Sequence, residues 1–174
     1  MSHLLRIRYI LVLAFMTLVV SLGNPATNVD AATNLKVHFI DVGQGDATLI
    51  QYGKSYSLID TGTESNYPKL RAYLEKMGVT KISSLILTHP DADHIGGADL
   101  LIEDYPIRTV YMTSKTSSTM EYKEVLRAID NYDVASLERV KKGDKIPFGK
   151  LKGKVLSADS KAGDTNDSGI VIKI

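Results

Sequence analysis

The chain has 174 residues, of which 44% are hydrophobic and 24% are charged. These values are ordinary for a globular protein and exclude an intrinsically disordered chain, and the length suits a single domain. A formal net charge of +1 excludes the strongly basic surface of a dedicated nucleic-acid-binding domain, although it leaves room for a local basic patch. The sequence contains no cysteine, so any metal site would have to use histidine and carboxylate ligands.

The first 31 residues are predicted to be a signal peptide. Arg6 and Arg8 give a positive start, and the apolar run over residues 9–22 is shorter than the ~20 residues that a transmembrane helix requires. Small side chains at positions 29–31 predict cleavage after Ala31, so we expect a secreted protein with no stable membrane span. The alternative is an uncleaved segment that anchors the protein to the membrane.

Residues 32–174 are predicted to form one α/β domain that opens with three strands. Alternation places Leu35, Val37 and Phe39 on one face of the first strand. Gly53-Lys54 is a two-residue hairpin signal between the second and third strands. The three strands are expected at residues 35–41, 47–52 and 55–60.

Helices and strands are then expected to alternate. A first helix has Pro68 in its first turn and Gly78 just past its end. A later helix begins at a capping box formed by Ser118 and Glu121. A short third helix lies between them in sequence, at 98–104. Further strands are expected at 81–87, 107–112, 133–140, 145–148, 151–157 and 169–174.

The loop over residues 88–97 carries the candidate chemistry. It reads THPDADHIGG and holds four side chains of metal-binding type, His89, Asp91, Asp93 and His94. Because alternate loop residues point the same way, His89 and Asp91 can converge on one ion while Asp93 and His94 turn toward a second. Imidazole and carboxylate suit Zn²⁺, Mn²⁺ or Fe²⁺, and two such ions ~3.5–4 Å apart are a common hydrolytic arrangement. The alternative is a solvated polar loop whose aspartates cap the next helix.

The same loop resembles the HxHxDH signature of the metallo-β-lactamase superfamily, with Asp91 in place of the middle histidine. That replacement is typical of the hydrolase domain of ComEC-type DNA-uptake proteins and their secreted relatives. Two other segments resemble the same branch, HFIDVGQGDA at 38–47 and LIDTG at 58–62. A weaker resemblance is NDSGIV at 166–171, which is similar to the Asn-x-Ser strand entry of that branch.

This resemblance implies an αββα sandwich and a metal-dependent hydrolase that uses two divalent ions, zinc or alternatively manganese. It places His89 and Asp91 at the first ion and Asp93 and His94 at the second. Asp93 would also act in catalysis by orienting the attacking water and receiving its proton. Asp60 would fix a metal-binding histidine or the loop, or alternatively would close the hairpin as a turn residue.

Two further aspartates, Asp41 and Asp46, are expected to shape the first turn beside the cleft, and a turn-forming role alone is the alternative. His38 is expected to be structural. The branch implies a phosphodiester or nucleic-acid substrate rather than a lactam. Six lysines between residues 141 and 154 could supply a phosphate-binding patch, or could simply form a solvated face.

The resemblance also predicts that this chain holds only the N-terminal half of the fold, because no histidine follows His94. We therefore expect one apolar sheet face to be uncovered and the site to need the C-terminal half or a partner chain. Three functions remain open at this point. They are a secreted hydrolase represented by a truncated chain, a non-catalytic exported fragment or binding module that needs a partner, and an exported cation-binding module without catalysis.

Overall fold

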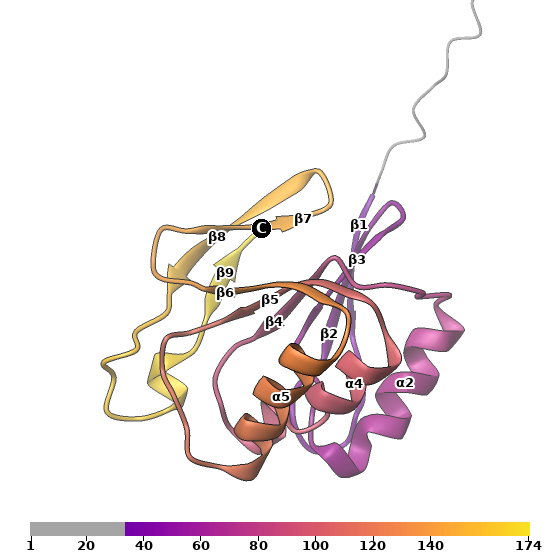
Figure 1. The fold of residues 1–174 in the computed structure, drawn as a ribbon. Helices are drawn as coiled ribbons and strands as arrows, with labels where there is room; N and C mark the ends of the chain where they lie inside the picture. The colour runs from indigo at the N-terminus through magenta and orange to yellow at the C-terminus, as the bar shows by residue number, and fades with distance from the viewer. Residues whose placement is uncertain (1–33) are drawn as a thin grey trace, which may run out of the picture. The chain divides into compact units, whose positions relative to one another are not determined.

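A computed structural model describes residues 34–174, which form a layer of helices, a six-stranded sheet and a three-stranded sheet (Figure 1). The mixed α/β class expected from the sequence is confirmed, and these layers correspond to the α, β and β layers of an αββα sandwich. The predicted signal peptide, residues 1–31, lies outside the described residues. Between residues 34 and 174, none of the helices has the length and apolar character needed to cross a bilayer.

The six-stranded sheet follows chain order, from β1 at one edge to β6 at the other. Its first three strands are antiparallel, and β3 to β6 are parallel. The predicted hairpin between β2 and β3 is confirmed, whereas β1 ends two residues earlier than expected. The strands are β1 (Leu35–Phe39), β2 (Thr48–Tyr52), β3 (Ser55–Ile59), β4 (Ser84–Leu87), β5 (Ile107–Met112) and β6 (Val134–Arg139).

The helices connect the parallel strands. Right-handed crossovers between successive parallel neighbours put their helices on one face of a sheet, and α2, α4 and α5 share such a face (Figure 1). Leu58, Leu70, Leu85, Leu101 and Val110 are fully buried between this face and the helices. The helical segments are η1 (Glu64–Asn66), α2 (Tyr67–Lys76), α3 (Ala92–Ile95), α4 (Ala98–Asp104) and α5 (Met120–Asn131).

Most helix ends were predicted correctly from nearby proline and glycine residues. Pro68 lies in the first turn of α2, and Gly78 follows its end with a φ of +68°. The capping box was wrong, because Thr119 is the N-cap of α5 and its hydroxyl accepts a hydrogen bond from the Tyr122 amide at 3.4 Å. The polar loop over residues 88–97 is also not wholly irregular, since it contains the single-turn helix α3.

The second sheet consists of β7 (Lys145–Phe148), β8 (Leu151–Ser157) and β9 (Val171–Lys173), all antiparallel. It covers the side of the large sheet that the helices leave free (Figure 1). Phe148 and Val155 pack there against Ile86 in a second core, and the Ser84 hydroxyl donates to the Pro147 carbonyl oxygen at 2.8 Å. The short helix η2 (Asn166–Ser168) precedes β9.

One apolar stretch stays uncovered at the edge of the large sheet. Leu35, Val37 and Phe39 of β1 have exposed fractions of 40%, 46% and 84%. The second sheet leaves them free because β7 packs against β2, β3 and β4, while β1 is the outermost strand. The expectation that a whole apolar sheet face would be uncovered was therefore wrong, because the second sheet covers the middle of this face and leaves the edge strand β1 free.

Candidate metal centre

The candidate residues gather at one edge of the large sheet. Asp60 follows β3, and Thr88 and His89 follow β4. Because β3 and β4 are parallel, their carboxyl ends meet at the same edge, where open α/β sheets usually place their ligands. The turn after β1 reaches this edge too. β2 is antiparallel to both β1 and β3, so β1 and β3 end at the same edge.

The turn after β1 lies directly against α3. The Asp46 amide donates to the Asp93 carbonyl oxygen at 3.1 Å. Gly45 has a φ of +97°, and a Cβ atom at this position would lie 2.1 Å from the same oxygen. Only glycine can therefore bring the two backbones this close, which explains the second glycine of the VGQGD turn.

Asp60 is the most strongly held side chain of the group. It is buried, and its carboxylate accepts hydrogen bonds from the Thr88 amide (2.8 Å), the Thr88 hydroxyl (2.6 Å) and His94 Nδ1 (2.8 Å). Its backbone adopts a φ of +57°, which a non-glycine residue rarely does. Asparagine and aspartate tolerate this region better than other side chains, and here three hydrogen bonds offset its cost.

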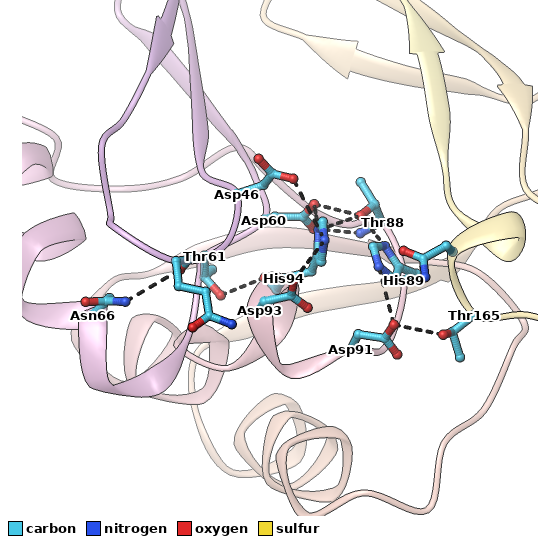
Figure 2. A network of polar contacts seen from close by, with 12 residues as sticks. Asp46, Asp60, Thr61, Asn66, Thr88, His89, Asp91, Asp93, His94 and Thr165 are labelled. Atoms are coloured by element: carbon cyan, nitrogen blue, oxygen red, sulfur yellow. Dashed lines mark hydrogen bonds and ion pairs between the residues drawn. The ribbon is translucent and has the colours of Figure 1, made fainter.

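The contact with Asp60 fixes the state of His94 (Figure 2). An ionised carboxylate can only accept, so Nδ1 must carry the hydrogen, and in the neutral ring Nε2 then presents its lone pair. That atom lies 3.8 Å from Asp93 Oδ2 and 3.8 Å from Asp46 Oδ2. Burial lowers the pKa of His94, but the hydrogen bond to Asp60 and the nearby carboxylates outweigh it and raise the pKa above its usual value.

Thr88 extends the same ordering to His89. Its single hydroxyl hydrogen goes to Asp60, so its oxygen accepts from His89 Nδ1 at 3.0 Å. The Nε2 atom of His89 therefore also carries a lone pair. This atom is buried and has no hydrogen-bond partner. The carboxylate oxygen Asp91 Oδ2 lies 3.6 Å from it. A buried acceptor without a donor is unfavourable unless a ligand occupies it.

The two imidazoles lie side by side, with ring centroids 3.8 Å apart and ring planes tilted by 49°. Each has an aspartate from the same loop close to its Nε2 atom, Asp91 beside His89 and Asp93 beside His94. Within residues 34–174 no group of three or more histidine and acidic side chains converges closely enough to hold an ion. The structure thus brings the candidate ligands together as pairs rather than as a complete coordination sphere.

The remaining predicted residues divide between the site and its surroundings. Asp46 faces His94, so its position is closer to the chemistry than a turn residue requires. Asp41 is exposed, and its carboxylate accepts from the Gly43 amide at 3.0 Å, which closes the turn. His38 bonds the Tyr73 hydroxyl at 3.0 Å on the helical side of the sheet.

Two threonines of the site were not identified from the sequence. Thr88 orders His89 and also bonds the Asp60 carboxylate that orders His94, and its position directly before His89 was the signal that could have indicated it. Thr165 donates to Asp91 Oδ2 at 2.8 Å from a loop 74 residues further along the chain. Its only sequence signal is that it precedes the Asn166-x-Ser168 segment.

Comparison with known proteins identifies the family to which these features correspond. A family model described as the metallo-β-lactamase superfamily matches residues 40–158. ComE operon protein 3 of Bacillus subtilis (strain 168) is 30% identical over 156 residues, which cover 79% of this chain and 20% of that protein. Recombination protein 2 of Haemophilus influenzae is 40% identical over 76 residues, which cover 41% of this chain and 10% of that protein.

Solved structures agree with the fold. The Rm3 metallo-β-lactamase aligns with a TM-score of 0.57 and 14% identity over 77% of this chain and 51% of its own. MEM-A1, a subclass B3 metallo-β-lactamase from a soil metagenome library, aligns with a TM-score of 0.57 and 20% identity over 77% and 52%. The chain thus spans about half the length of these enzymes and a fifth or less of the two curated relatives.

Proposed function

The chain belongs to the metallo-β-lactamase superfamily, and from this premise we propose that it is a metal-dependent hydrolase that cleaves phosphodiesters. The observation that carries the proposal is the buried Nε2 atom of His89, which has no hydrogen-bond partner and lies beside Asp91. A second imidazole, with its own aspartate, lies next to it. A pair of cations would satisfy both lone pairs and neutralise both carboxylates.

The donor set fits divalent ions of the borderline class. His89 with Asp91 would hold one ion and His94 with Asp93 the other, and imidazole with carboxylate suits Zn²⁺ or Mn²⁺. When bound, such ions lower the pKa of water toward neutrality and polarise a phosphoryl oxygen.

The protein's own side chains would prepare this chemistry. Asp60 holds the hydrogen on His94 Nδ1 directly, and it holds the one on His89 Nδ1 through the Thr88 hydroxyl. Both Nε2 atoms are thereby kept free for a ligand. The Asp93 side chain is 46% exposed, so its carboxylate can meet solvent and accept the proton that an attacking water releases.

A phosphodiester substrate is supported by two observations. The name of one relative refers to recombination, a process that acts on nucleic acid. The second sheet of this chain carries closely spaced lysines, which could contact phosphate groups although the net charge is only +1. We extend the proposal to export through residues 1–31, which a mass measurement of the mature chain recovered from the culture medium would test.

Phosphodiester cleavage tests the proposal directly. The full chain would be incubated with bis(p-nitrophenyl) phosphate and with a DNA duplex, in Zn²⁺, in Mn²⁺ and in EDTA. We expect cleavage only when Zn²⁺ or Mn²⁺ is present. We expect the His89→Ala and Asp93→Ala variants to lose this cleavage activity. The matched control is Asp130→Asn, which alters an exposed carboxylate on α5. Cleavage that persists in EDTA or in both site variants would refute the proposal.

A second function is favoured by the absence of a three-ligand group within residues 34–174. In this case the chain binds one or two cations at the same side chains without catalysis. Zn²⁺ binding that His89→Ala abolishes, in a protein with no measurable phosphodiesterase activity in either metal, would distinguish it from the hydrolase.

A further inference from the structure

The Asp91 carboxylate does not make the contact that its place in the chain favours. Asp91 is the N-cap of α3, where an aspartate side chain usually accepts a hydrogen bond from an amide of the first turn, but it makes no such bond here. Its Oδ2 atom accepts instead from the Thr165 hydroxyl at 2.8 Å and lies 3.6 Å from His89 Nε2 (Figure 2). Thr165 therefore holds the carboxylate toward the imidazole and away from the helix.

Thr165 ends a loop, residues 159–165, that lies between β8 and η2. Within residues 34–174, two hydrogen bonds join this loop to distant parts of the chain. One is the bond from Thr165 to Asp91, and the other runs from Lys115 Nζ to the Ala162 carbonyl oxygen at 2.7 Å. The other hydrogen bonds of the loop stay inside it or reach η2. The two distant bonds thus fix where the loop lies beside the site.

Lys115 is itself held in the direction that its bond requires. Its amide donates to the Thr113 hydroxyl at 3.1 Å, and the Thr113 carbonyl oxygen accepts from Arg139 Nη1 at 2.8 Å. The Lys115 side chain is half-buried, and it belongs to none of the ion pairs among residues 34–174. An ammonium group in this neighbourhood would repel a bound cation, so charge does not explain its place. What it supplies is a hydrogen bond to Ala162, three residues before Thr165.

We propose that Thr165 and Lys115 are positioning residues for the first metal pair, His89 and Asp91. Thr165 fixes the Asp91 carboxylate beside the imidazole, and Lys115 fixes the loop that carries Thr165. Without the Thr165 hydroxyl, the carboxylate can turn to cap α3, which moves Oδ2 away from His89 Nε2. The inference rests on the metal binding that the proposed function assigns to this pair, but it does not require cleavage.

Zn²⁺ affinity of the full chain, measured by competition with a chromogenic chelator, tests the role of Thr165. In T165V we expect the affinity to fall about tenfold, at the lower end of the range for residues that orient metal ligands. T165S keeps the hydroxyl and should bind Zn²⁺ as the unmodified chain does. The urea midpoint in EDTA should be the same in both variants, because a capping bond to α3 replaces the bond that valine removes. A lower midpoint with unchanged Zn²⁺ affinity in T165V would show a merely structural threonine and overturn the inference.

The role of Lys115 is tested by the sign of the effect. K115M should weaken Zn²⁺ binding, whereas the loss of a positive charge would by itself strengthen it. K115R keeps a donor for the Ala162 carbonyl oxygen and should restore the affinity. The matched control is K161M, which removes a charge from an exposed position of the same loop and should not weaken binding. Tighter binding by K115M, or equal weakening in K161M, would overturn the role of Lys115.

The His89→Ala background separates this inference from the proposed hydrolase. There, T165V and K115M should leave Zn²⁺ affinity unchanged, because the pair that they position has been removed, and a further loss would overturn the inference. Zn²⁺ binding that depends on His89 and on the Thr165 hydroxyl, in a chain without phosphodiesterase activity, would refute the hydrolase and support the positioning role. Zn²⁺ binding that does not depend on His89 would overturn both.

Discussion

The two imidazoles of the site are ordered in different ways. His94 donates directly to the buried Asp60 carboxylate, whereas His89 is reached only through the Thr88 hydroxyl. His94 Nε2 faces two partly exposed carboxylates, while His89 Nε2 is buried and has no partner. The comparison shows that one buried carboxylate can set the tautomer of two rings, one directly and one through a hydroxyl.

Asp60→Asn should give the largest effect, because it disturbs both rings. Asparagine would direct N–H groups at a site where Thr88 and His94 already donate, which leaves buried donors unpaired. We expect the free energy of unfolding to fall by about 3 kcal/mol, as for a broken buried charge network. Urea denaturation of the metal-free chain measures this, with Asp130→Asn as the exposed control. Unchanged stability would contradict the central role of Asp60.

Measuring Zn²⁺ affinity should separate the effect of Asp60 on metal binding from its effect on stability. Residues that orient metal ligands typically change metal affinity by about 10–100-fold when replaced. Asp60→Asn should fall within this range in competition titrations against a chromogenic chelator. An affinity equal to that of the unmodified chain would mean that the rings do not need this ordering.

His94→Ala and His89→Ala should differ in stability although both lower Zn²⁺ affinity. His94→Ala removes a partner of Asp60 and should cost about 1.5–3 kcal/mol of unfolding free energy, since hydrogen bonds to charged groups contribute this much. His89→Ala removes a buried acceptor without a donor, so we expect a change within about 1 kcal/mol. Urea denaturation in EDTA gives both values, and the reverse order would refute the comparison.

Thr88→Val should act mainly on His89, although Asp60 also loses one of its hydrogen bonds. Valine keeps the shape of threonine but removes the hydroxyl between Asp60 and His89, so His89 loses its fixed tautomer. We expect Zn²⁺ affinity to fall about tenfold, at the lower end of the range for orienting groups. Thr88→Ser keeps the hydroxyl and is the matched control. Equal behaviour of the two variants would show that no relay operates.

The pH dependence of the metal-free chain should show the smallest effect. The pKa of His94 is raised in the folded state, so its contribution to stability is complete below the unfolded value of about 6.5. That contribution is lost as the pH rises through the folded-state pKa. The free energy of unfolding should therefore decrease as the pH rises from below to above neutrality. This decrease should be smaller in His94→Ala.

The fold was largely predictable because its signals are local. The hairpin at Gly53-Lys54 and the helix ended by Gly78 depend on turn chemistry within a few residues. The position of Thr165 beside Asp91 depends instead on how the second sheet packs, and no local pattern encodes it. The restriction of the exposed apolar face to Phe39 and its neighbours on β1 was equally hidden, because alternation along a strand shows which residues share a face but not how much of that face is covered.

The cluster of candidate ligands in residues 88–97 was visible for a different reason. Four metal-binding side chains within six residues are unusual in any loop, so their type and spacing suffice to indicate the site. Only the resemblance indicated the role of Asp60, since 28 residues separate it from Thr88 and parallel pairing of β3 and β4 brings them together.

The outermost strand has a practical consequence for work on this chain in isolation. β1 combines free backbone hydrogen-bonding groups with Phe39, whose exposed fraction is 84%, and such strands can template pairing between molecules. Preparations should therefore self-associate as the concentration rises, and assays are best run dilute. The substitution Phe39→Lys would place a gatekeeper charge on this edge strand and oppose such aggregation. Phe39 is not one of the candidate metal ligands, so their chemistry should stay intact.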